Sequence, residues 1–377
     1  ENTLTEYTEF SQVDFLLTYE QRKLQLNTLR LMFDLEVTPA SGTLVNVSSA
    51  GTSGIFYDNS VGLHGVIDTI STSMNGSVVE NLTDYGRLVA METQATMTQS
   101  ELASGESSVE GKAALPEHTN LLLRGSTSGK FTANADGTTH NYLNSIVEPQ
   151  STALKIKCCL NKSFVVDGSM PLISFRKSGA VKVSLRLARN TAFLFGDTST
   201  GASYKLKNLR LTYVSRPDDG SDEQVMCRGV IGIKQSLNSD AANISVIVPG
   251  LTNSVSASFQ PQTLENTALA NNYQQHVVPG LTQLQYLFND ASNTFITFII
   301  KSQLESLERY VDSFNSSGSN SASLVRLRAN QSYGIGTSLG GYVDLSNKKF
   351  NIQIQSKIGE IGATQIIYLY FHTLLTL

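Results

Sequence analysis

The residue types that most often carry chemistry are few and scattered in this chain. None of the five histidines lies at metal-ligand spacing from another histidine or from a cysteine. His372 lies in an apolar segment and His64 just before a predicted strand, so both are predicted to be structural. The sequence therefore predicts no zinc site. The five are His64, His118, His140, His276 and His372.

A glycine-rich segment, YGIGTSLGGY, superficially matches a phosphate-binding loop. Its spacing is GxGxxxGG, and the residues that follow do not predict a helix. Dinucleotide binding requires a helix whose amino end faces the pyrophosphate. We therefore interpret the segment as a plain glycine-rich loop. Its glycines are Gly334, Gly336, Gly340 and Gly341.

Four acidic residues interrupt the apolar rhythm in RPDDGSDEQ, residues 216–224. Clustered carboxylates suit a calcium ion, but their spacing does not match an EF-hand loop. The preferred interpretation is a solvated acidic linker between two domains, and a calcium site is the alternative. The acids are Asp218, Asp219, Asp222 and Glu223.

Neither a Ser/His/Asp signature, a nucleophile elbow nor a paired-acid motif stands out. The sequence therefore predicts no catalytic, metal or cofactor-binding residue, no cofactor, and a protein that is not an enzyme. The net charge is −4, and the 28 Lys and Arg are scattered rather than gathered in a basic run. Because sequence-independent binding of DNA phosphates requires clustered Lys and Arg residues, direct nucleic-acid binding is not expected.

The elements that position these residues are predominantly strands. The segment HGVIDTISTSMNGSVVENLTDYGRLVAM predicts a tight antiparallel hairpin at Asn75-Gly76, because this pair accepts the positive φ angles of a type I′ turn. A short helix follows, capped by Asn81 or Thr83. Its apolar face would hold Tyr85, Leu88 and Val89.

Period-two alternation marks further strands. In the stretch 154–160, Leu154, Ile156, Cys158 and Leu160 would face a core, which predicts a buried Cys158 and an exposed Cys159. Adjacent cysteines can hardly bridge each other, so Cys158, Cys159 and Cys227 indicate folding in a reducing compartment. Further strands are expected at 24–37, 181–187, 209–213, 230–233, 244–248, 255–259, 294–300, 324–327, 350–354 and 364–377, with a second helix at 303–314.

Many short strands with turn signals between them predict an all-β chain of antiparallel sandwiches rather than a parallel α/β sheet. The 377 residues favour two domains, each with enough strands for a jelly roll. We place the first jelly roll at 25–215, the linker at 216–225 and the second jelly roll at 226–377. Residues 93–150 have little periodicity and predict long loops at one end of a sandwich.

Residues 1–24 are predicted to form an arm. Leu4, Tyr7, Phe10, Val13 and Leu17 recur at roughly helical spacing, which predicts an amphipathic helix that packs under its own domain or a neighbour. An arm that touches an internal membrane is the alternative, although its acidic residues oppose attraction to anionic lipid. The start lacks the basic region of a signal peptide, and the chain contains no apolar run of about 18 residues.

The order of these segments resembles the double jelly-roll major capsid proteins of icosahedral double-stranded DNA viruses, in the branch of polinton-like viruses and virophages. The phrase NGSVVENLTDYGRL follows the early strands, and PLISFRKSGAVKVSLRLARNTAFLFG is similar to the long strand of the first roll. YKLKNLRLTYVSRPDD is similar to the strand that closes that roll. HVVPGLTQLQYLFN and the ending GYVDLSNKKFNIQIQSKIGEIGATQIIYLYFHTLLTL are similar to the turn and final strands of the second.

The resemblance implies two consecutive jelly rolls per chain and a homotrimeric, pseudo-hexagonal capsomer. Such capsomers tile an icosahedral shell, often over an internal membrane, so the implied partners are neighbouring capsomers and penton and minor capsid proteins. The implied location is the virion, after synthesis and assembly in the host cell. A β-sandwich adhesin or carbohydrate-binding surface protein is the alternative, and a glycoside hydrolase on a jelly-roll frame is a third hypothesis.

Overall fold

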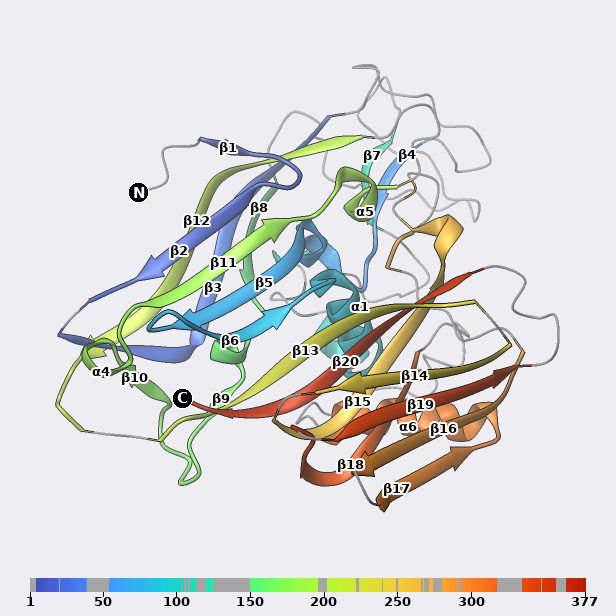
Figure 1. Cartoon of the computed structure of the whole chain (residues 1–377). Coiled ribbons are helices and arrows are strands. Elements are labelled where there is room, and N and C mark those ends of the chain that lie inside the picture. The colour runs from blue at the N-terminus through green and yellow to red at the C-terminus, as the bar shows by residue number, and fades with distance from the viewer. Residues whose placement is uncertain are drawn as a thin grey trace.

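The structure is a computed structural model, and its description covers most of the chain. Two antiparallel β-sandwiches lie side by side (Figure 1). The described residues are 5–19, 21–38, 54–102, 104, 107, 109–112, 120–124, 150–195, 202–221, 224–238, 240–248, 250–265, 267, 271–273, 280–290, 293–316, 334–346, 348–356 and 364–377.

The first sandwich packs a five-stranded sheet on a four-stranded sheet. The five-stranded sheet has the order β1-β12-β3-β10, with β8 also paired to β3, and the four-stranded sheet has the order β2-β11-β5-β6. The strands are β1 (Glu6–Tyr7), β2 (Gln12–Leu17), β3 (Arg22–Thr38), β5 (Ile67–Met74), β6 (Ser77–Leu82), β8 (Gln150–Lys155), β10 (Leu172–Ser174), β11 (Val181–Leu187) and β12 (Ser203–Pro217). A separate pair joins β4 (Gly54–Tyr57) to β7 (Asn120–Arg124).

The second sandwich repeats this plan. One sheet has the order β18-β15-β20-β13-β9 and the other β14-β19-β16-β17. The first sheet takes β9 from the first half of the chain, so the two halves share a sheet. The strands are β9 (Ser163–Phe164), β13 (Met226–Leu237), β14 (Ala241–Ile247), β15 (Leu251–Pro261), β16 (Leu281–Asp290), β17 (Asn293–Ile300), β18 (Ile335–Asp344), β19 (Lys349–Ser356) and β20 (Gln365–Thr376).

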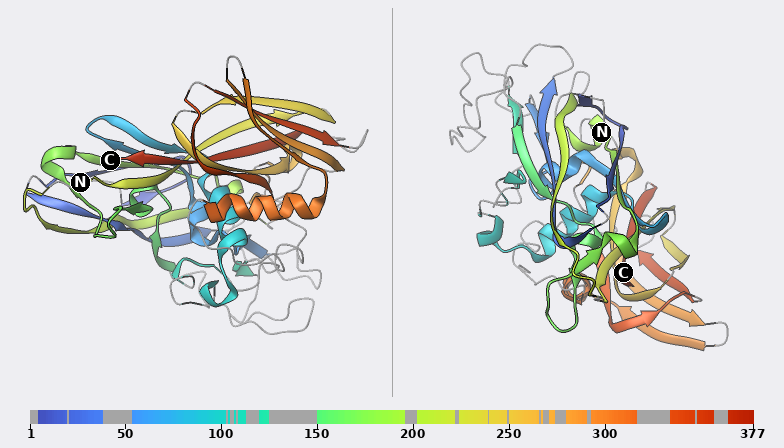
Figure 2. Two further views of the ribbon diagram at one scale, coloured as in Figure 1. Left: turned by 90° about the horizontal axis from the view of Figure 1, so that it is seen from below. Right: turned by 90° about the vertical axis from the view of Figure 1, so that its left-hand side faces the viewer.

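The helices are short, and the two longest lie where the sandwiches meet. α1 (Tyr85–Thr96) is buried along its whole length, and α6 (Gln303–Ser316) lies along one face of the second sandwich (Figure 2). The others are α2 (Gln99–Leu102), α4 (Phe175–Ser178), α5 (Asn190–Phe193) and the 3₁₀ turns η1 (Gly62–Val66), η2 (Cys159–Asn161) and η3 (Gln262–Leu264). The all-β prediction with two sandwiches and a few short helices is confirmed.

The hairpin prediction is confirmed, but the helix cap is different. Asn75 and Gly76 have φ angles of 47° and 80°, and β5 pairs with β6 on either side of them. Neither Asn81 nor Thr83 caps α1: its N-cap is Asp84, in the left-handed region and without a side-chain cap bond. Asn81 cannot serve because it still belongs to β6.

The predicted N-terminal helix is wrong, because this part of the arm contains strands. β1 pairs with β12 and β2 pairs with β11, so both join sheets of the first sandwich. A turn at Phe10, whose φ angle is 62°, separates them. Val13 and Leu17 are buried while Asp14 is exposed, and a spacing of four residues fits a strand as well as a helix turn. The proposed domain boundaries stay a prediction.

Two further predictions need correction. Cys159 is buried rather than exposed, because β8 ends at Lys155 and the chain turns through η2 into the core. The glycine-rich segment instead forms strand β18, and a Cβ at Gly334, just before this strand, would lie 2.0 Å from the Ala257 carbonyl oxygen. The glycines therefore allow close backbone approach, which a local sequence pattern does not reveal.

Other predictions can be compared with the structure only in part, because they concern residues that lie partly outside the described ranges. The predicted loops at 93–150 begin within α1 and include α2 and β7, and the rest lies largely outside the described residues. The predicted strand at 324–327, His118, His140 and His276 also lie outside them. β16 was not predicted.

The last strand, β20, has both faces buried. Ile367, Leu369 and Phe371 belong to the core of the second sandwich, whereas Tyr368 and Tyr370 contact the core that continues from the first. Because neither face is exposed to solvent, the sequence of the strand is a continuous apolar run and does not alternate between apolar and polar residues. One apolar body therefore extends from the first sandwich across the junction.

Candidate functional site at the junction of the two sandwiches

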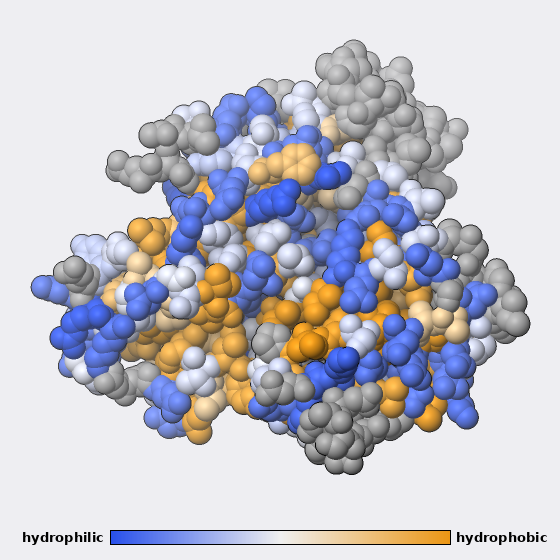
Figure 3. All heavy atoms as spheres, viewed as in Figure 1, coloured by the Kyte–Doolittle hydropathy of each residue, from blue (hydrophilic) through white to orange (hydrophobic). Residues whose placement is uncertain are grey.

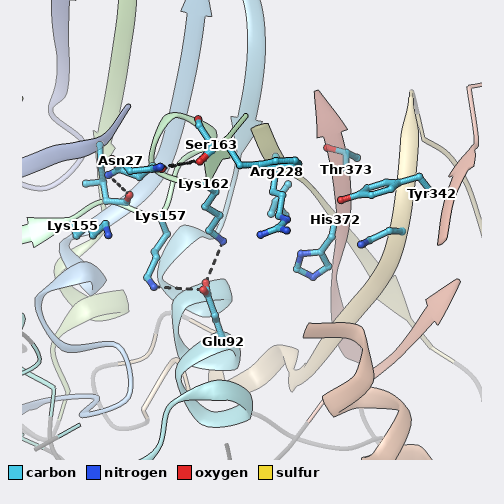
Figure 4. Close-up of a pocket in the computed structure, with 16 residues that line it drawn as sticks. Asn27, Glu92, Lys155, Lys157, Lys162, Ser163, Arg228, Tyr342, His372 and Thr373 are labelled. Atoms are coloured by element: carbon cyan, nitrogen blue, oxygen red, sulfur yellow. Dashed lines mark hydrogen bonds and ion pairs between the residues drawn. The ribbon is translucent and has the colours of Figure 1, made fainter. Parts of the chain in front are cut away.

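A polar cavity of about 410 Å³ lies between the two sandwiches (Figure 4). The first half of the chain lines it from α1, from β3 and from the segment that runs from the end of β8 to β9, and the second half from β13, β15, β18 and β20. The charged lining residues are Glu92, Lys155, Lys157, Lys162 and Arg228, and the polar ones include Asn27, Asn161, Asn253, Tyr342, His372 and Thr373.

Two asparagines hold the turn that carries the lysines. Asn27 has a φ angle of 64°, and its amide exchanges hydrogen bonds with Ser163, whose N–H donates at 3.0 Å and whose carbonyl accepts at 2.8 Å. The Asn161 side chain accepts from Leu29 N–H at 3.0 Å and donates to the carbonyls of Leu29 and Ile156. The turn around η2 is thereby tied to β3 through Asn161 and Ser163.

Glu92, on α1, forms ion pairs with two of the lysines. Lys157 Nζ and Lys162 Nζ lie 3.4 and 3.3 Å from its two carboxylate oxygens (Figure 4). Burial alone would raise the pKa of Glu92, but the positive charges of Lys157, Lys162 and Lys112 outweigh burial and hold this pKa well below its usual range. Glu92 is therefore ionised, and it joins α1 to the turn.

The opposite wall comes from the second sandwich. The Arg228 backbone N–H donates to the Lys162 carbonyl at 2.9 Å, and the Arg228 guanidinium lies 5.0 Å from the centre of the Phe164 ring. His372 Nε2 lies 3.1 Å from Ser256 Oγ. Burial, with the nearby Lys162 charge, lowers the pKa of His372 to about 3, so its imidazole is neutral at pH 7.

Next to the cavity, buried polar side chains connect the two halves. Glu80 of β6 accepts from Cys159 N–H at 2.7 Å and from Val230 N–H at 3.0 Å. Arg87 of α1 donates to the Gln260 side chain and to the Asn272 backbone carbonyl. Its guanidinium lies 4.0 Å from the centre of the Tyr368 ring. These contacts fix how the sandwiches meet.

The residues singled out from sequence have structural partners. His64 is buried, with Nδ1 2.8 Å from the Tyr85 hydroxyl and Nε2 3.2 Å from Glu110. His372 is buried in β20, as described above. Asp219 pairs with Lys23 at 2.5 Å, and Asp218 bonds the Ser174 hydroxyl, whereas Asp222 and Glu223 lie outside the described residues.

Sequence reasoning missed the cavity. The alternation predicted for residues 154–160 puts Lys155 and Lys157 on the outer face of a strand, and the sequence predicts no role for Lys162, Arg228 and Glu92. Their segments are far apart in the chain, and no local spacing relates them. Among the described residues, no group of three or more His, Cys, Asp or Glu is placed to hold a metal ion, and the three described cysteines are free thiols.

Comparison with solved structures relates the whole chain to capsid proteins. The mavirus major capsid protein matches with a TM-score of 0.50 and 11% identity, over 99% of this chain and 90% of that one. The Faustovirus major capsid protein matches with a TM-score of 0.52 and 9% identity, over 100% and 88%. A chain of the PBCV-1 virus capsid matches with a TM-score of 0.51 and 8% identity, over 100% and 96%.

No family model and no curated sequence matches the chain. With identities this low, the matches establish the fold, and the chain has the double jelly-roll fold of major capsid proteins. These three matched proteins, each covered over nearly its whole length, are capsid proteins of viruses. In the described part of the chain, no helix is both long and apolar enough to cross a bilayer.

Proposed function

We propose that this protein is the major capsid protein of an icosahedral double-stranded DNA virus. The observation that carries the proposal is the match of nearly the whole chain, both sandwiches included, to major capsid proteins of mavirus and Faustovirus. In this role three chains form a pseudo-hexagonal capsomer, because each contributes two similar sandwiches. The protein acts as a surface rather than as an enzyme, and its location is the virion.

The surface of the sandwiches supports a role in assembly. Apolar side chains interrupt the polar surface in several places (Figure 3). Five large ones in the described residues are more than 60% exposed, and such side chains suit contacts between subunits. They are Leu16, Tyr19, Val78, Val166 and Ile247.

The proposed partners are two further copies of the chain, neighbouring capsomers, and penton and minor capsid proteins. We do not include a membrane contact through the N-terminal arm. That hypothesis depended on an amphipathic helix, and residues 6–17 contain two strands instead. Direct nucleic-acid binding is also not proposed, since the net charge is −4 and the basic residues are scattered.

Light scattering coupled to size exclusion tests the proposal. We expect a particle of three times the 40.9 kDa chain mass, with a pseudo-hexagonal outline in negative-stain micrographs. Larger closed shells would also support it. A chain that stays monomeric at high concentration and binds glycans on an array would instead support the β-sandwich adhesin.

A further inference from the structure

The junction cavity carries more positive than negative charge. Four cationic side chains line it, and Glu92 is the one carboxylate among the described lining residues. Glu92 is already held by Lys157 and Lys162. Lys155 and Arg228 have no carboxylate within ion-pair distance in the described part of the chain. The charge of the cavity is therefore left uncompensated.

Arg228 lines the cavity and has a donor without a partner. Its Nε is buried and has no hydrogen-bond partner in the described structure. The backbone bond to Lys162 and the stacking on Phe164 hold the side chain against the cavity. A buried N–H of a charged group that lacks an acceptor is costly, so a shift of the guanidinium that gave this donor an acceptor in the cavity would stabilise the protein.

The size and the donors of the cavity select the ligand chemistry. A volume of about 410 Å³ falls within the range of small-molecule sites. Ammonium and guanidinium groups on different walls suit a ligand with several charged oxygens pointing in different directions, and phosphate groups have this geometry. A single carboxylate would leave much of the positive charge unbalanced.

We propose that the junction cavity binds a small phosphate-bearing anion. Arg228, Lys155 and Lys162 are its binding groups, and Glu92 competes with the ligand for the lysines. Because the ligand contacts both sandwiches, binding would stabilise the junction between them. This site is independent of the assembly proposed above, so it is tested on unassembled protein.

Titration calorimetry and thermal unfolding of the full chain test the site, with inorganic phosphate, pyrophosphate and tripolyphosphate as probes. Sodium chloride at the same ionic strength is the control for general screening. We expect saturable binding and a rise in the melting temperature, both increasing with the number of phosphate groups. Equal effects of chloride and of the phosphates would overturn the proposal.

Two substitutions are expected to act in opposite directions. Arg228→Gln removes a charged donor and should weaken binding by about tenfold or more. Glu92→Gln removes the competing carboxylate and should tighten binding. Arg216→Gln, at an exposed arginine of β12 outside the cavity, is the matched control and should leave the affinity unchanged.

If Arg228→Gln does not fold, Lys155→Gln replaces it as the test variant. Lys155→Gln should also weaken binding. If the control Arg216→Gln weakens binding as much as the cavity variants, the anion binds the general surface and the proposal is wrong. The proposal also fails if duplex DNA binds while the three small phosphates do not, because a duplex cannot enter a cavity of this size.

Discussion

His372 is a neutral histidine in a place where protonation is unfavourable. It lies in the centre of a sheet, beside Ser256 and edge-to-face with Phe314 at 5.4 Å between ring centres. Its pKa in the folded protein is about 3, against 6.5 for an ordinary histidine. The unfolded chain therefore takes up this proton first as the pH falls, and acid favours unfolding.

We predict that His372→Gln makes the unfolding free energy less sensitive to acid. His372 contributes stability that is present above pH 6.5 and is lost as the pH falls toward 3, with a slope of up to about 1.4 kcal/mol per pH unit. Urea unfolding of wild type and variant between pH 3 and 7 measures the difference. Parallel pH profiles for the two proteins would contradict the prediction.

At this scale the sequence predicted the character of some residues but not the candidate site. His64 and His372 were expected to be structural, and both are buried with polar partners. The cavity could not be predicted, because its charges come from α1, from the end of β8 and the turn after it, and from β13. Asn27 and Asn161 hold the turn against β3, and the hydrogen bonds of their side chains to distant backbone groups leave no periodic signal.

Among the elements, α1 shows how packing overrides intrinsic preference. A glycine inside a helix costs about 1 kcal/mol relative to alanine, so propensity alone predicts that Gly86→Ala is stabilising. In the structure a Cβ at Gly86 would lie 2.7 Å from the Tyr273 ring, whose hydroxyl is anchored on the Gly65 carbonyl at 2.8 Å. The ring cannot move away without losing that bond.

We therefore predict that Gly86→Ala destabilises the protein by about 1–3 kcal/mol, as overpacking does. Chemical denaturation measures the change. The control is the same substitution combined with Tyr273→Leu, where the added methyl group meets no ring and should cost less than in the wild-type background. A Gly86→Ala variant more stable than wild type would show that helix propensity prevails.

β20 is the element on which the second sandwich depends. It is central in its sheet and pairs with both β13 and β15. We predict that deletion of residues 365–377 unfolds this sandwich. β13 and β15 would lose their hydrogen-bonded partner, and the apolar cores on both faces of β20 would lose buried side chains. Circular dichroism and limited proteolysis measure the loss, and a clipped chain that melts like the full one would contradict it.

Sequence patterns predicted strands with one exposed face better than other elements. β11 alternates between buried and less buried residues as its sequence does. The arm was misassigned because the spacing of its apolar residues fits both a helix and a strand. β18 was missed because its Gly336 leaves room for the backbone of β15 and the side chain of Ser313, which approach it closely. Such requirements arise from neighbours distant in the chain and are not encoded locally.

In the whole molecule, α1 couples the two sandwiches through Arg87. This side chain is 2% exposed, reaches Gln260 and stacks on Tyr368. We predict that Arg87→Met, which keeps much of the apolar stem but removes the donors, lowers stability by about 2–4 kcal/mol, because the Gln260 oxygen and a backbone carbonyl lose their partner. Calorimetry of unassembled protein should then resolve two unfolding transitions instead of one.

Arg216→Met, at an exposed arginine, is the matched control and should leave the calorimetric profile unchanged. If Arg87→Met also unfolds in one transition with an unchanged midpoint, the side chain does not couple the sandwiches.

The shared apolar body has a consequence for biosynthesis. Ile366, Tyr368 and Tyr370 of β20 and the buried face of α6 complete the layer that covers α1, although α1 is translated more than 200 residues earlier than α6. The amino-terminal half thus leaves the ribosome with uncovered apolar side chains, and it stays aggregation-prone until β20 has emerged. The first sandwich therefore completes its apolar core only after β20 has been translated.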